Sequence, residues 1–346
     1  MCKLHYVLLS VLALAFMQKT STLAAEPTTK TSDNIAINSQ IDKNNMTFDA
    51  AIAALKRGDT ARAIQIYTFL AEQGNTIASL SLGKIYYEGI GIPINYIESE
   101  KWYMKATEGG NAEAKDRLSQ VYFDISLMYD NGIEGFAKNT VVAMDYLKKS
   151  ALLMVGPSAN SASMLSLYYE GGHDDIQADW QEFARWTILA AELGDAEAEK
   201  KLQIGEVQLV IGNFYKLEEP PNLSEAAKWY RKAADQNIYK AMTYLGEILH
   251  NGKGIVQDYR EASQLMQKAA EHGEATAQQL YGMMYMLGHG VQQDNVQALK
   301  WLTIAASKSN EPYAGNMVQM LQRRMSPEQV QKSQQLVSEW GNVQRK

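Results

Sequence analysis

Cysteine is almost absent from this chain. Of its 346 residues only Cys2 is a cysteine, and it stands before an apolar run close to the N-terminus. A lipid-anchored cysteine would have to follow that run, so Cys2 cannot carry an anchor. If the run is removed as a signal, the remaining chain can form no disulfide and offers neither a thiol nucleophile nor a cysteine ligand for a metal. We therefore expect packing alone to stabilise the fold.

Excess positive charge is also missing. The net charge is −6 at pH 7, and the basic residues form no cluster larger than an adjacent pair such as Arg323-Arg324. Proteins that bind nucleic acid generally need a basic stripe that neutralises phosphates. The composition therefore argues against general binding of nucleic acid.

The apolar run near the N-terminus, Tyr6–Met17, has twelve residues, which is too short to span a bilayer as a helix. A weakly basic start precedes it and the small residues Thr22-Leu23-Ala24 follow it, as in a secretory signal peptide. We predict a signal peptide over residues 1–24 and a flexible polar tether over 25–46. The alternative is an uncleaved, buried N-terminal helix. With a signal, the protein is exported and periplasmic or secreted, the bacterial envelope being the expected location, and it keeps no stable membrane span.

What the chain does contain is a unit that occurs twice between residues 240 and 307. Gly246 and Gly282 lie 36 residues apart, and so do Leu265 and Trp301. A fixed period of this size is typical of stacked helical hairpins rather than of one globular core. The period therefore predicts the architecture of the chain.

Apolar residues at helical spacing place about seven hairpins over residues 47–325. In the third and fifth hairpins the first helix is predicted to be long, reaching from Ala112 to Tyr129 and from Ala196 to Tyr215. In register, one column of the hairpins holds mostly small residues: Gly83, Ser126, Leu165, Gly212, Gly246 and Gly282. Another holds mostly large rings: Trp102, Tyr146, Trp186, Trp229, Leu265 and Trp301. We expect the small residues to let two helices approach closely and the rings to fill the space between hairpins.

Three hairpins also contain a Gly-x-Gly pair, namely Gly89/Gly91, Gly252/Gly254 and Gly288/Gly290. Such a pair can form a phosphate-binding loop when it follows a strand. Here no strand is predicted before it, and the pair recurs with the period. We interpret it as the loop that ends the first helix through left-handed backbone turns.

The last segment departs from the period. Ser326-Pro327-Glu328-Gln329 combines a serine N-cap, a proline in the first turn and a glutamine placed for a capping box. Val330, Val337 and Trp340 then give the helix one apolar side. We predict a C-terminal capping helix over 326–346, which covers the stacking face of the last hairpin.

Together these residues resemble the Sel-one-like repeat, a long-loop relative of the tetratricopeptide repeat (TPR). The resemblance covers about Ala78 to Ser307 and rests on an Ala-rich start, Leu-Gly-x-x-Tyr, Gly-x-Gly, Asp, Ala-x-x-Trp and Lys-Ala-Ala. It implies an all-α fold: a right-handed α-solenoid of about seven TPR-like helix-turn-helix repeats with a C-terminal capping helix. It also implies a protein–protein interaction scaffold or adaptor that binds a protein or peptide. Some exported relatives are cysteine-rich and linked to penicillin binding, but this chain lacks those cysteines.

No catalytic grouping holds together in the sequence. Ser81-Leu82-Gly83-Lys84 matches the S-x-x-K motif of serine β-lactamases, but the companion motifs are missing or misplaced. His173, His250, His272 and His289 fall in different repeats, so we expect no shared metal, and nothing indicates a cofactor. We therefore predict that the protein is not an enzyme. The alternative is an envelope enzyme or carbohydrate-binding protein, including a β-lactam hydrolase or binder, that uses the concave face of the solenoid.

At the position after the tyrosine of each first helix, the residue type varies from hairpin to hairpin, whereas the packing columns keep theirs. It reads Tyr87, Asp130, Tyr169, Lys216, His250 and Met286, with Glu88 and Glu170 beside it. We call these eight residues the variable column. The position lies about 100° around the helix from the core-facing residue, and first helices of such stacks line the inner curve. Our hypothesis is a groove on the concave face for a peptide or a partner helix. The alternative is that these side chains are simply exposed.

Overall fold

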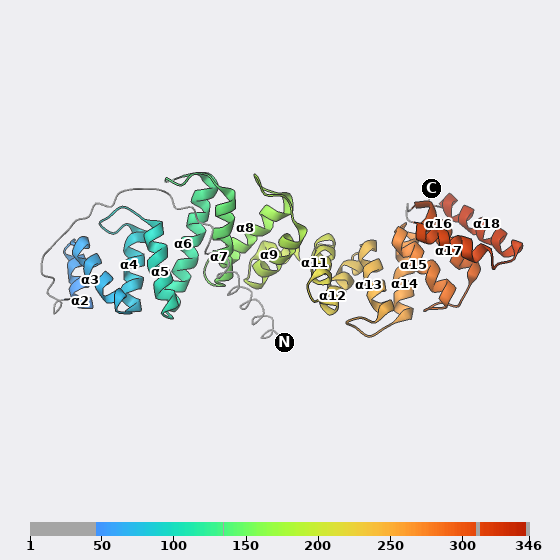
Figure 1. Ribbon diagram of the computed structural model, residues 1–346, viewed down its shortest axis with the longest axis horizontal. Helices are drawn as coiled ribbons and strands as arrows, with labels where there is room; N and C mark the ends of the chain where they lie inside the picture. The colour runs from blue at the N-terminus through green and yellow to red at the C-terminus, as the bar shows by residue number, and fades with distance from the viewer. Residues whose placement is uncertain (1–45, 134, 309–311, 344–346) are drawn as a thin grey trace. The chain divides into compact units, whose positions relative to one another are not determined.

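A computed structural model describes residues 46–133, 135–308 and 312–343 (Figure 1). In that part of the chain it contains seventeen helices and no strand, so the predicted all-α fold is confirmed. The predicted signal peptide, and all of the predicted tether except Met46, lie outside the described residues. The chain divides into two compact units, and the boundary along the chain falls between Ser161 and Ala162, within one helix.

The first unit is a series of helices that pack mainly against their neighbours in the chain. They are α2 (Phe48–Lys56), α3 (Thr60–Glu72), α4 (Thr76–Glu88), α5 (Tyr96–Glu108), α6 (Ala112–Asn131), α7 (Thr140–Leu152) and the beginning of α8 (Ser158–Gly171). The pairs α2–α3, α4–α5 and α6–α7 are the first three hairpins. The predicted long first helix of the third hairpin is present as α6.

The second unit continues the same arrangement. It contains the rest of α8, then α9 (Trp180–Glu192), α10 (Ala196–Lys201), α11 (Gly205–Leu217), α12 (Leu223–Asp235), α13 (Tyr239–Asn251), α14 (Tyr259–Glu271), α15 (Ala275–Leu287), α16 (Asn295–Lys308), α17 (Pro312–Gln322) and α18 (Pro327–Val343). The pairs α8–α9, α11–α12, α13–α14 and α15–α16 are the remaining four hairpins. Over the described residues the chain is therefore an α-solenoid of seven hairpins, with the short α10 between the fourth and the fifth, followed by two more helices.

The second helix of every hairpin begins at an Asp or Asn whose side-chain oxygen accepts a hydrogen bond from a backbone N–H of the first turn. These residues are Asp59, Asn95, Asn139, Asp179, Asn222, Asp258 and Asp294. The first turn of a helix leaves its N–H groups without partners in the helix, and such a cap satisfies one of them. The repeated cap therefore fixes where each second helix starts.

The small column does bring helices together, as expected, but its partners lie one position after the large column. A Cβ atom added at Gly83, Gly212, Gly246 or Gly282 would come within 3.0 Å of a side chain on the second helix of the same hairpin. Those side chains are Tyr103, Tyr230, Met266 and Leu302. Trp102, Trp186 and Trp301 of the large column are buried, whereas Trp229 and Leu265 are only half-buried. The large column therefore lies on the correct turn of the second helix, one residue before the side chain that faces the small column.

The Gly-x-Gly pairs close the loops between first and second helices. All six glycines have φ between 65° and 79°, the left-handed region in which a side chain is strained. The second glycine of each pair also lies against the start of the second helix of the preceding hairpin. Gly91 lies against Thr60, Gly254 against Leu223 and Gly290 against Tyr259, each without room for a Cβ atom. Each loop thus contributes to the packing of successive hairpins.

The predicted continuous helix from Ala196 to Tyr215 is wrong, because the chain breaks into α10 and α11. The carbonyl groups freed at the break have side-chain partners. Gln208 Nε2 donates to the carbonyl oxygen of Leu202 at 2.8 Å, and Gln236 Nε2 of α12 donates to that of Gln203 at 2.8 Å. A break in a helix is tolerated when its polar backbone groups are satisfied in this way.

The C-terminal helices cover the end of the stack. The capping box at the start of α18 is formed, with Ser326 N donating to Gln329 Oε1 at 3.0 Å and Gln329 N donating to Ser326 Oγ at 3.3 Å. The ring of Trp340 stands edge-on to that of Trp301, with centroids 6.2 Å apart. Helix α17 adds Leu321 to an apolar cluster with residues of α16. The lid therefore consists of two helices rather than the single one expected.

Candidate interaction surface

The structure places the variable column at the C-terminal ends of successive first helices. The residues lie on α4 (Tyr87, Glu88), α6 (Asp130), α8 (Tyr169, Glu170), α11 (Lys216), α13 (His250) and α15 (Met286). Glu88 is exposed and the other seven are half-buried. Simple exposure therefore describes Glu88, whereas the other seven side chains are partly covered by their neighbours.

Two of the polar residues in the column, Tyr87 and Lys216, contact the following first helix. Tyr87 Oη donates to Asp124 Oδ2 of α6 at 2.7 Å. Lys216 Nζ lies 3.7 Å from Glu247 Oε2 of α13 and 4.4 Å from the centroid of the Tyr244 ring. These contacts join one hairpin to the next, so much of the chemistry of the column is used inside the stack.

The Tyr87 hydroxyl keeps its proton and so remains a hydrogen-bond donor. Burial raises its pKa well above the ordinary tyrosine value, and the hydrogen bond to Asp124 and the negative charge of that carboxylate raise it further. The hydroxyl therefore keeps its proton at any physiological pH, and the contact between α4 and α6 does not depend on pH there.

Glu170 of α8 forms an ion pair with Lys201 of α10. The Lys201 ammonium also lies 5.4 Å from the centroid of the Phe183 ring. The side chain of Lys201 is only 24% exposed, so this pair is better shielded from solvent than a typical surface pair. It ties the short helix α10 to the preceding hairpin.

His250 of α13 meets His289, which lies between the two glycines of the α15–α16 loop. His250 Nε2 and His289 Nδ1 are 3.0 Å apart. The ring of Tyr259 stacks on that of His289, with centroids 4.3 Å apart and planes 22° apart. Two histidines from different repeats thus lie together, because the loop of the seventh hairpin reaches back toward the sixth.

The three remaining members of the column have other surroundings. Met286 packs against the apolar cluster of α16 and α17. Tyr169 packs against the main core of the second unit. Asp130 lies half-buried near the end of α6. The structure thus gives several members of the column contacts with the next hairpin, each with a different partner residue.

Sequence reasoning missed the residues that complete these contacts, namely Asp124, Glu247 and His289. Tyr87 and Asp124 are separated by 37 positions, and His250 and His289 by 39. Both separations are close to the 36-residue period. A search for polar pairs one period apart is the signal that could have found them.

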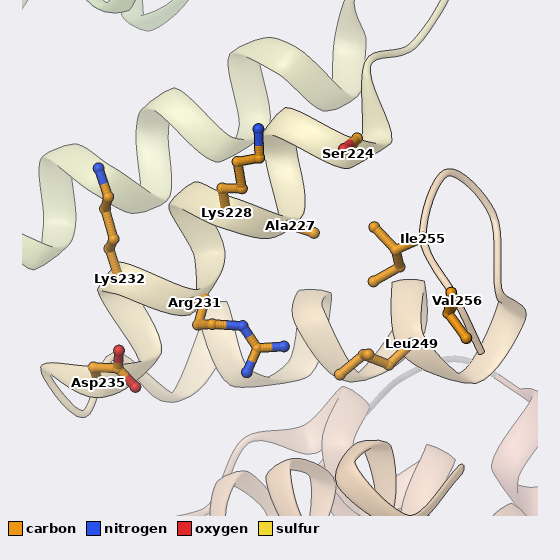
Figure 2. Close-up of a pocket in the computed structure, with 9 residues that line it drawn as sticks. All are labelled: Ser224, Ala227, Lys228, Arg231, Lys232, Asp235, Leu249, Ile255 and Val256. Carbon is orange, nitrogen blue, oxygen red and sulfur yellow. The ribbon is translucent and has the colours of Figure 1, made fainter. Parts of the chain in front are cut away.

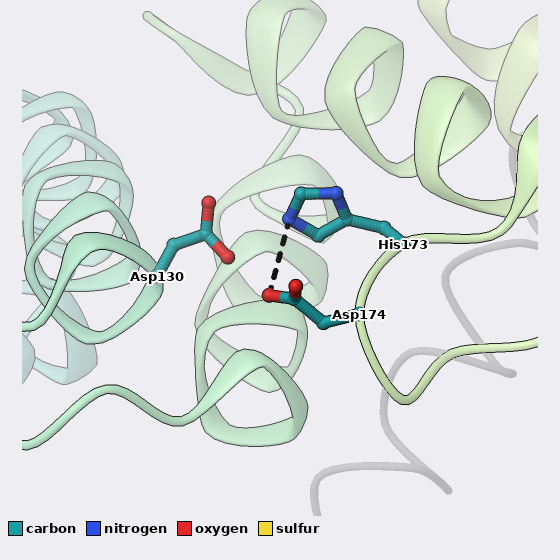
Figure 3. Close-up of side chains that lie close together, drawn as sticks. All are labelled: Asp130, His173 and Asp174. Atoms are coloured by element: carbon teal, nitrogen blue, oxygen red, sulfur yellow. Dashed lines mark ion pairs between the residues drawn. The ribbon is translucent and has the colours of Figure 1, made fainter.

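His173 and Asp174 form a second polar pair in the second unit, at the turn between α8 and α9 (Figure 3). His173 Nε2 lies 3.7 Å from Asp174 Oδ2. The His173 ring also stacks on that of Tyr168, with centroids 4.2 Å apart. Asp130, drawn in the same figure, belongs to the first unit, and we do not count it with this pair.

A hollow of about 500 Å³ lies beside α12, and no sequence motif pointed to it (Figure 2). Its apolar side consists of Leu249, Ile255 and Val256, of which Val256 is 87% exposed. Lys228, Arg231 and Lys232 of α12 form the basic side. These cations already have partners: Lys228 pairs with Glu225, Arg231 pairs with Glu261, and Lys232 lies over the Trp229 ring. The hollow is therefore an apolar recess whose basic side chains already have partners.

The S-x-x-K sequence does not form a catalytic dyad. Ser81 Oγ donates to the carbonyl oxygen of Ile77, in its own helix, at 2.8 Å. Lys84 Nζ lies 3.9 Å from Glu88 Oε1 and its side chain is 57% exposed. A serine nucleophile needs a base within hydrogen-bond reach of its hydroxyl. Here both groups have other partners.

The described helices include none that is long and apolar enough to cross a lipid bilayer.

Comparison with protein families gives six matches to the Sel1 repeat. They cover residues 77–111, 119–153, 159–195, 214–238, 240–274 and 275–310. Four of the matched segments begin at the start of the first helix of a hairpin, whereas the second begins within α6 and the fourth close to the end of α11. The first hairpin, α2–α3, lies before the first match.

Two curated relatives are fungal proteins. Chitin synthase regulatory factor 3 of Schizosaccharomyces pombe is 28% identical over 262 residues, which are 75% of this chain and 26% of that protein. Chitin synthase regulator SKT5 of Saccharomyces cerevisiae is 25% identical over 228 residues, which are 63% of this chain and 30% of that protein. The chain thus spans less than a third of the length of either relative.

Two solved structures are similar. One is a protective antigen present in uropathogenic Escherichia coli strains that displays an SLR fold; it is 27% identical, with a TM-score of 0.42, and the match covers 83% of this chain and 59% of that one. The other is a Sel1 repeat protein from Oxalobacter formigenes, 24% identical with a TM-score of 0.32, covering 76% of this chain and 97% of that one.

Proposed function

Because the chain belongs to the Sel1 repeat family, we propose that it is an exported scaffold that binds a protein partner and carries no catalytic site of its own. Proteins of stacked hairpins present a long surface built from repeated units, which suits the binding of an extended segment or a helix. The observation that supports this role is a stack of hairpins whose one catalytic-looking motif, S-x-x-K, is taken up by helix contacts.

The names of the two fungal relatives also support a non-catalytic role, since both are called regulators. What those proteins regulate is not carried over, because this chain covers 26% and 30% of their lengths. We propose only the coarser property, that the repeats act by holding another protein.

We assign the partner to the face that carries the variable column. The packing columns keep their chemistry from hairpin to hairpin, whereas this face changes from tyrosine to lysine, histidine and methionine. A surface whose residue types differ between repeats, on a scaffold whose packing residues stay alike, is suited to one particular partner. Glu88, at the end of α4, is the exposed member of the column and our choice for a direct contact.

The test uses a photo-crosslinking amino acid placed at single positions of the full-length protein in its native host. Glu88 reports on the variable column and Val256 on the hollow beside α12. Glu113 and Lys200 are the controls, since their side chains are 63% and 71% exposed on other helix surfaces. We expect one defined protein to be crosslinked from Glu88 and not from the controls.

The other outcomes are equally informative. Capture of that protein from Val256 alone would move the binding surface to the hollow. Equal capture from the control positions would contradict a specific surface. Turnover of a chromogenic β-lactam or another hydrolase substrate by the purified protein, lost in Ser81→Ala, would contradict the non-catalytic role.

Export is a separate part of the proposal and rests on the apolar run Tyr6–Met17 with the small residues after it. N-terminal sequencing of the protein from its native host should give a mature start near residue 25. A protein that starts at Met1 and is protected from protease added outside the cell membrane would contradict export and leave the scaffold role intact.

A further inference from the structure

We propose that His250 and His289 bind one divalent transition-metal ion, which clamps the sixth hairpin to the seventh. The two imidazoles come from different repeats, one from the end of α13 and one from the loop between α15 and α16. Their facing nitrogens, His250 Nε2 and His289 Nδ1, are 3.0 Å apart. Imidazole nitrogens are the commonest protein ligands of such ions.

The separation of the rings suits an ion between them. Two imidazole nitrogens, each about 2.0–2.1 Å from a tetrahedral ion, lie about 3.3 Å apart, with their ring centres about 5.2 Å apart. The ring centroids of His250 and His289 are 5.2 Å apart. The rings can therefore admit an ion by turning about their own centres, which opens the nitrogens by a few tenths of an ångström.

The neighbours of the pair already orient both rings. His250 Nδ1, the nitrogen that faces away from His289, lies 3.4 Å from Asn251 Oδ1, where a hydrogen bond would leave the lone pair of Nε2 free for a ligand bond. The ring of Tyr259 stacks on His289 and stands edge-on to His250 at 5.1 Å. A ligand that is held in place before the ion arrives loses less freedom on binding.

The chemistry of the pair selects the class of ion. Two neutral nitrogens favour Cu²⁺, Ni²⁺ or Zn²⁺ over Mg²⁺ and Ca²⁺, which prefer oxygen. Both histidines are half-exposed, so water completes the coordination shell. Binding requires both facing nitrogens to be unprotonated, so a proton on His289 Nδ1 would move to Nε2 of the same ring.

The matched control for this site is His272. Its ring stacks on that of Tyr239 with centroids 4.1 Å apart, much as His289 stacks on Tyr259, but its Nδ1 lies 2.8 Å from the carbonyl oxygen of Lys268. His272 thus shares the aromatic neighbour of the proposed ligand and has no imidazole facing it in the described structure. His173→Gln is introduced into every protein, so that the His173–Asp174 pair contributes nothing.

The experiment is a calorimetric titration of Zn²⁺ into the untagged full chain in a buffer that does not chelate metals. We expect one site with a dissociation constant in the micromolar range, and Cu²⁺ should bind more tightly than Zn²⁺. His250→Gln and His289→Gln should each weaken binding at least about tenfold, as the loss of one of two ligands requires, while His272→Gln leaves it unchanged. Circular dichroism checks that each variant is folded.

A second measurement keeps the proposal independent of the variants. Saturating Zn²⁺ should slow amide hydrogen exchange in α13 and in the loop between α15 and α16, and leave α2–α5 unchanged. Absence of binding at 100 µM Zn²⁺, or binding that survives in both His250→Gln and His289→Gln, would overturn the site. Neither result bears on the scaffold role, because the partner test uses other residues.

Discussion

At the scale of the residue, the two helices of a hairpin can approach closely because the first helix has a glycine where they face each other, with a hydrogen atom in place of a side chain. Gly212 faces the ring of Tyr230, and Gly83 faces that of Tyr103, in each case without room for a methyl group. Tyr103 and Tyr230 are among the largest fully buried side chains of the molecule. A helix-interior glycine costs about 1 kcal/mol relative to alanine, and the close packing of the ring compensates for that cost.

Gly212→Ala should therefore destabilise the protein, although alanine is the better helix former. The added methyl group must displace the Tyr230 ring, and we expect a loss of about 1–3 kcal/mol in the free energy of unfolding. The matched control is Gly315→Ala in α17, where a Cβ atom meets nothing within 4 Å. That change should stabilise by about 0.5–1 kcal/mol. Urea unfolding of both variants checks the opposite signs.

The buried tyrosines make stability depend on alkaline pH. Burial raises the pKa of Tyr103 from the ordinary 10.0 to about 12. The folded state therefore disfavours the phenolate, so the contribution of this group to stability is complete below pH 10 and decreases as the pH rises from 10 toward 12. Over that interval each such tyrosine should cost about 1.4 kcal/mol per pH unit. Tyrosinate absorbance that rises together with loss of helical circular dichroism above pH 10 is the expected result, and titration of Tyr103 before unfolding would contradict it.

At the scale of the element, polar contacts between first helices set how one hairpin follows the next. Tyr87 on α4 bonds to Asp124 on α6, and Lys216 on α11 pairs with Glu247 on α13. Each contact joins the end of one first helix to the following first helix. These contacts add direction to the apolar packing, which by itself has none.

Tyr87→Phe tests the contribution of one such contact. The change removes the hydroxyl and keeps the ring, which stands edge-on to Tyr96 at 5.7 Å. We expect a loss of about 0.5–1.5 kcal/mol, because Asp124 still accepts a hydrogen bond from Gln120 Nε2 at 2.8 Å. Hydrogen exchange should become faster in α4 and α6 and stay unchanged in α13–α16. A uniform increase along the chain would contradict a local role.

The sequence predicted those elements whose signals are local or periodic. The seven hairpins, the Gly-x-Gly loops and the capping box at Ser326 follow from spacing and from the conformational freedom of glycine. The break between α10 and α11 could not be predicted, because Gln236, which satisfies one of its carbonyl groups, comes from the next hairpin. The partners of the variable column were missed for the same reason, since a pair such as Tyr87 and Asp124 becomes visible only when two repeats are placed side by side.

At the scale of the whole molecule, each hairpin contacts mainly its neighbours in the chain, and the described residues divide into two compact units. Stability in such a stack is approximately a sum over hairpins and over the interfaces between them. A mutation that destabilises one hairpin should therefore lower the stability of that hairpin and of the adjoining interfaces only.

Tyr230→Ala makes this measurable. The sequence pointed to Trp229 as the buried ring of the fifth hairpin, but Trp229 is half-buried and Tyr230 is completely buried. Removing the Tyr230 ring should cost about 3–5 kcal/mol. We expect faster hydrogen exchange in α11, α12 and α13, with α2–α5 remaining as protected as before. One cooperative unfolding transition that includes α2–α5 would contradict this expectation.

The asparagines and aspartates that begin the second helices also affect how the protein ages. Asparagine side chains slowly hydrolyse to carboxylates, which commonly damages structure where the amide nitrogen is needed. At Asn95, Asn139 and Asn222 the helix uses only the amide oxygen, and the equivalent positions Asp59, Asp179 and Asp258 make the same bond with a carboxylate. A conversion that yields ordinary aspartate would keep the bond and add a negative charge where the positive end of the helix dipole favours it. Such a conversion would therefore leave these helix starts in place.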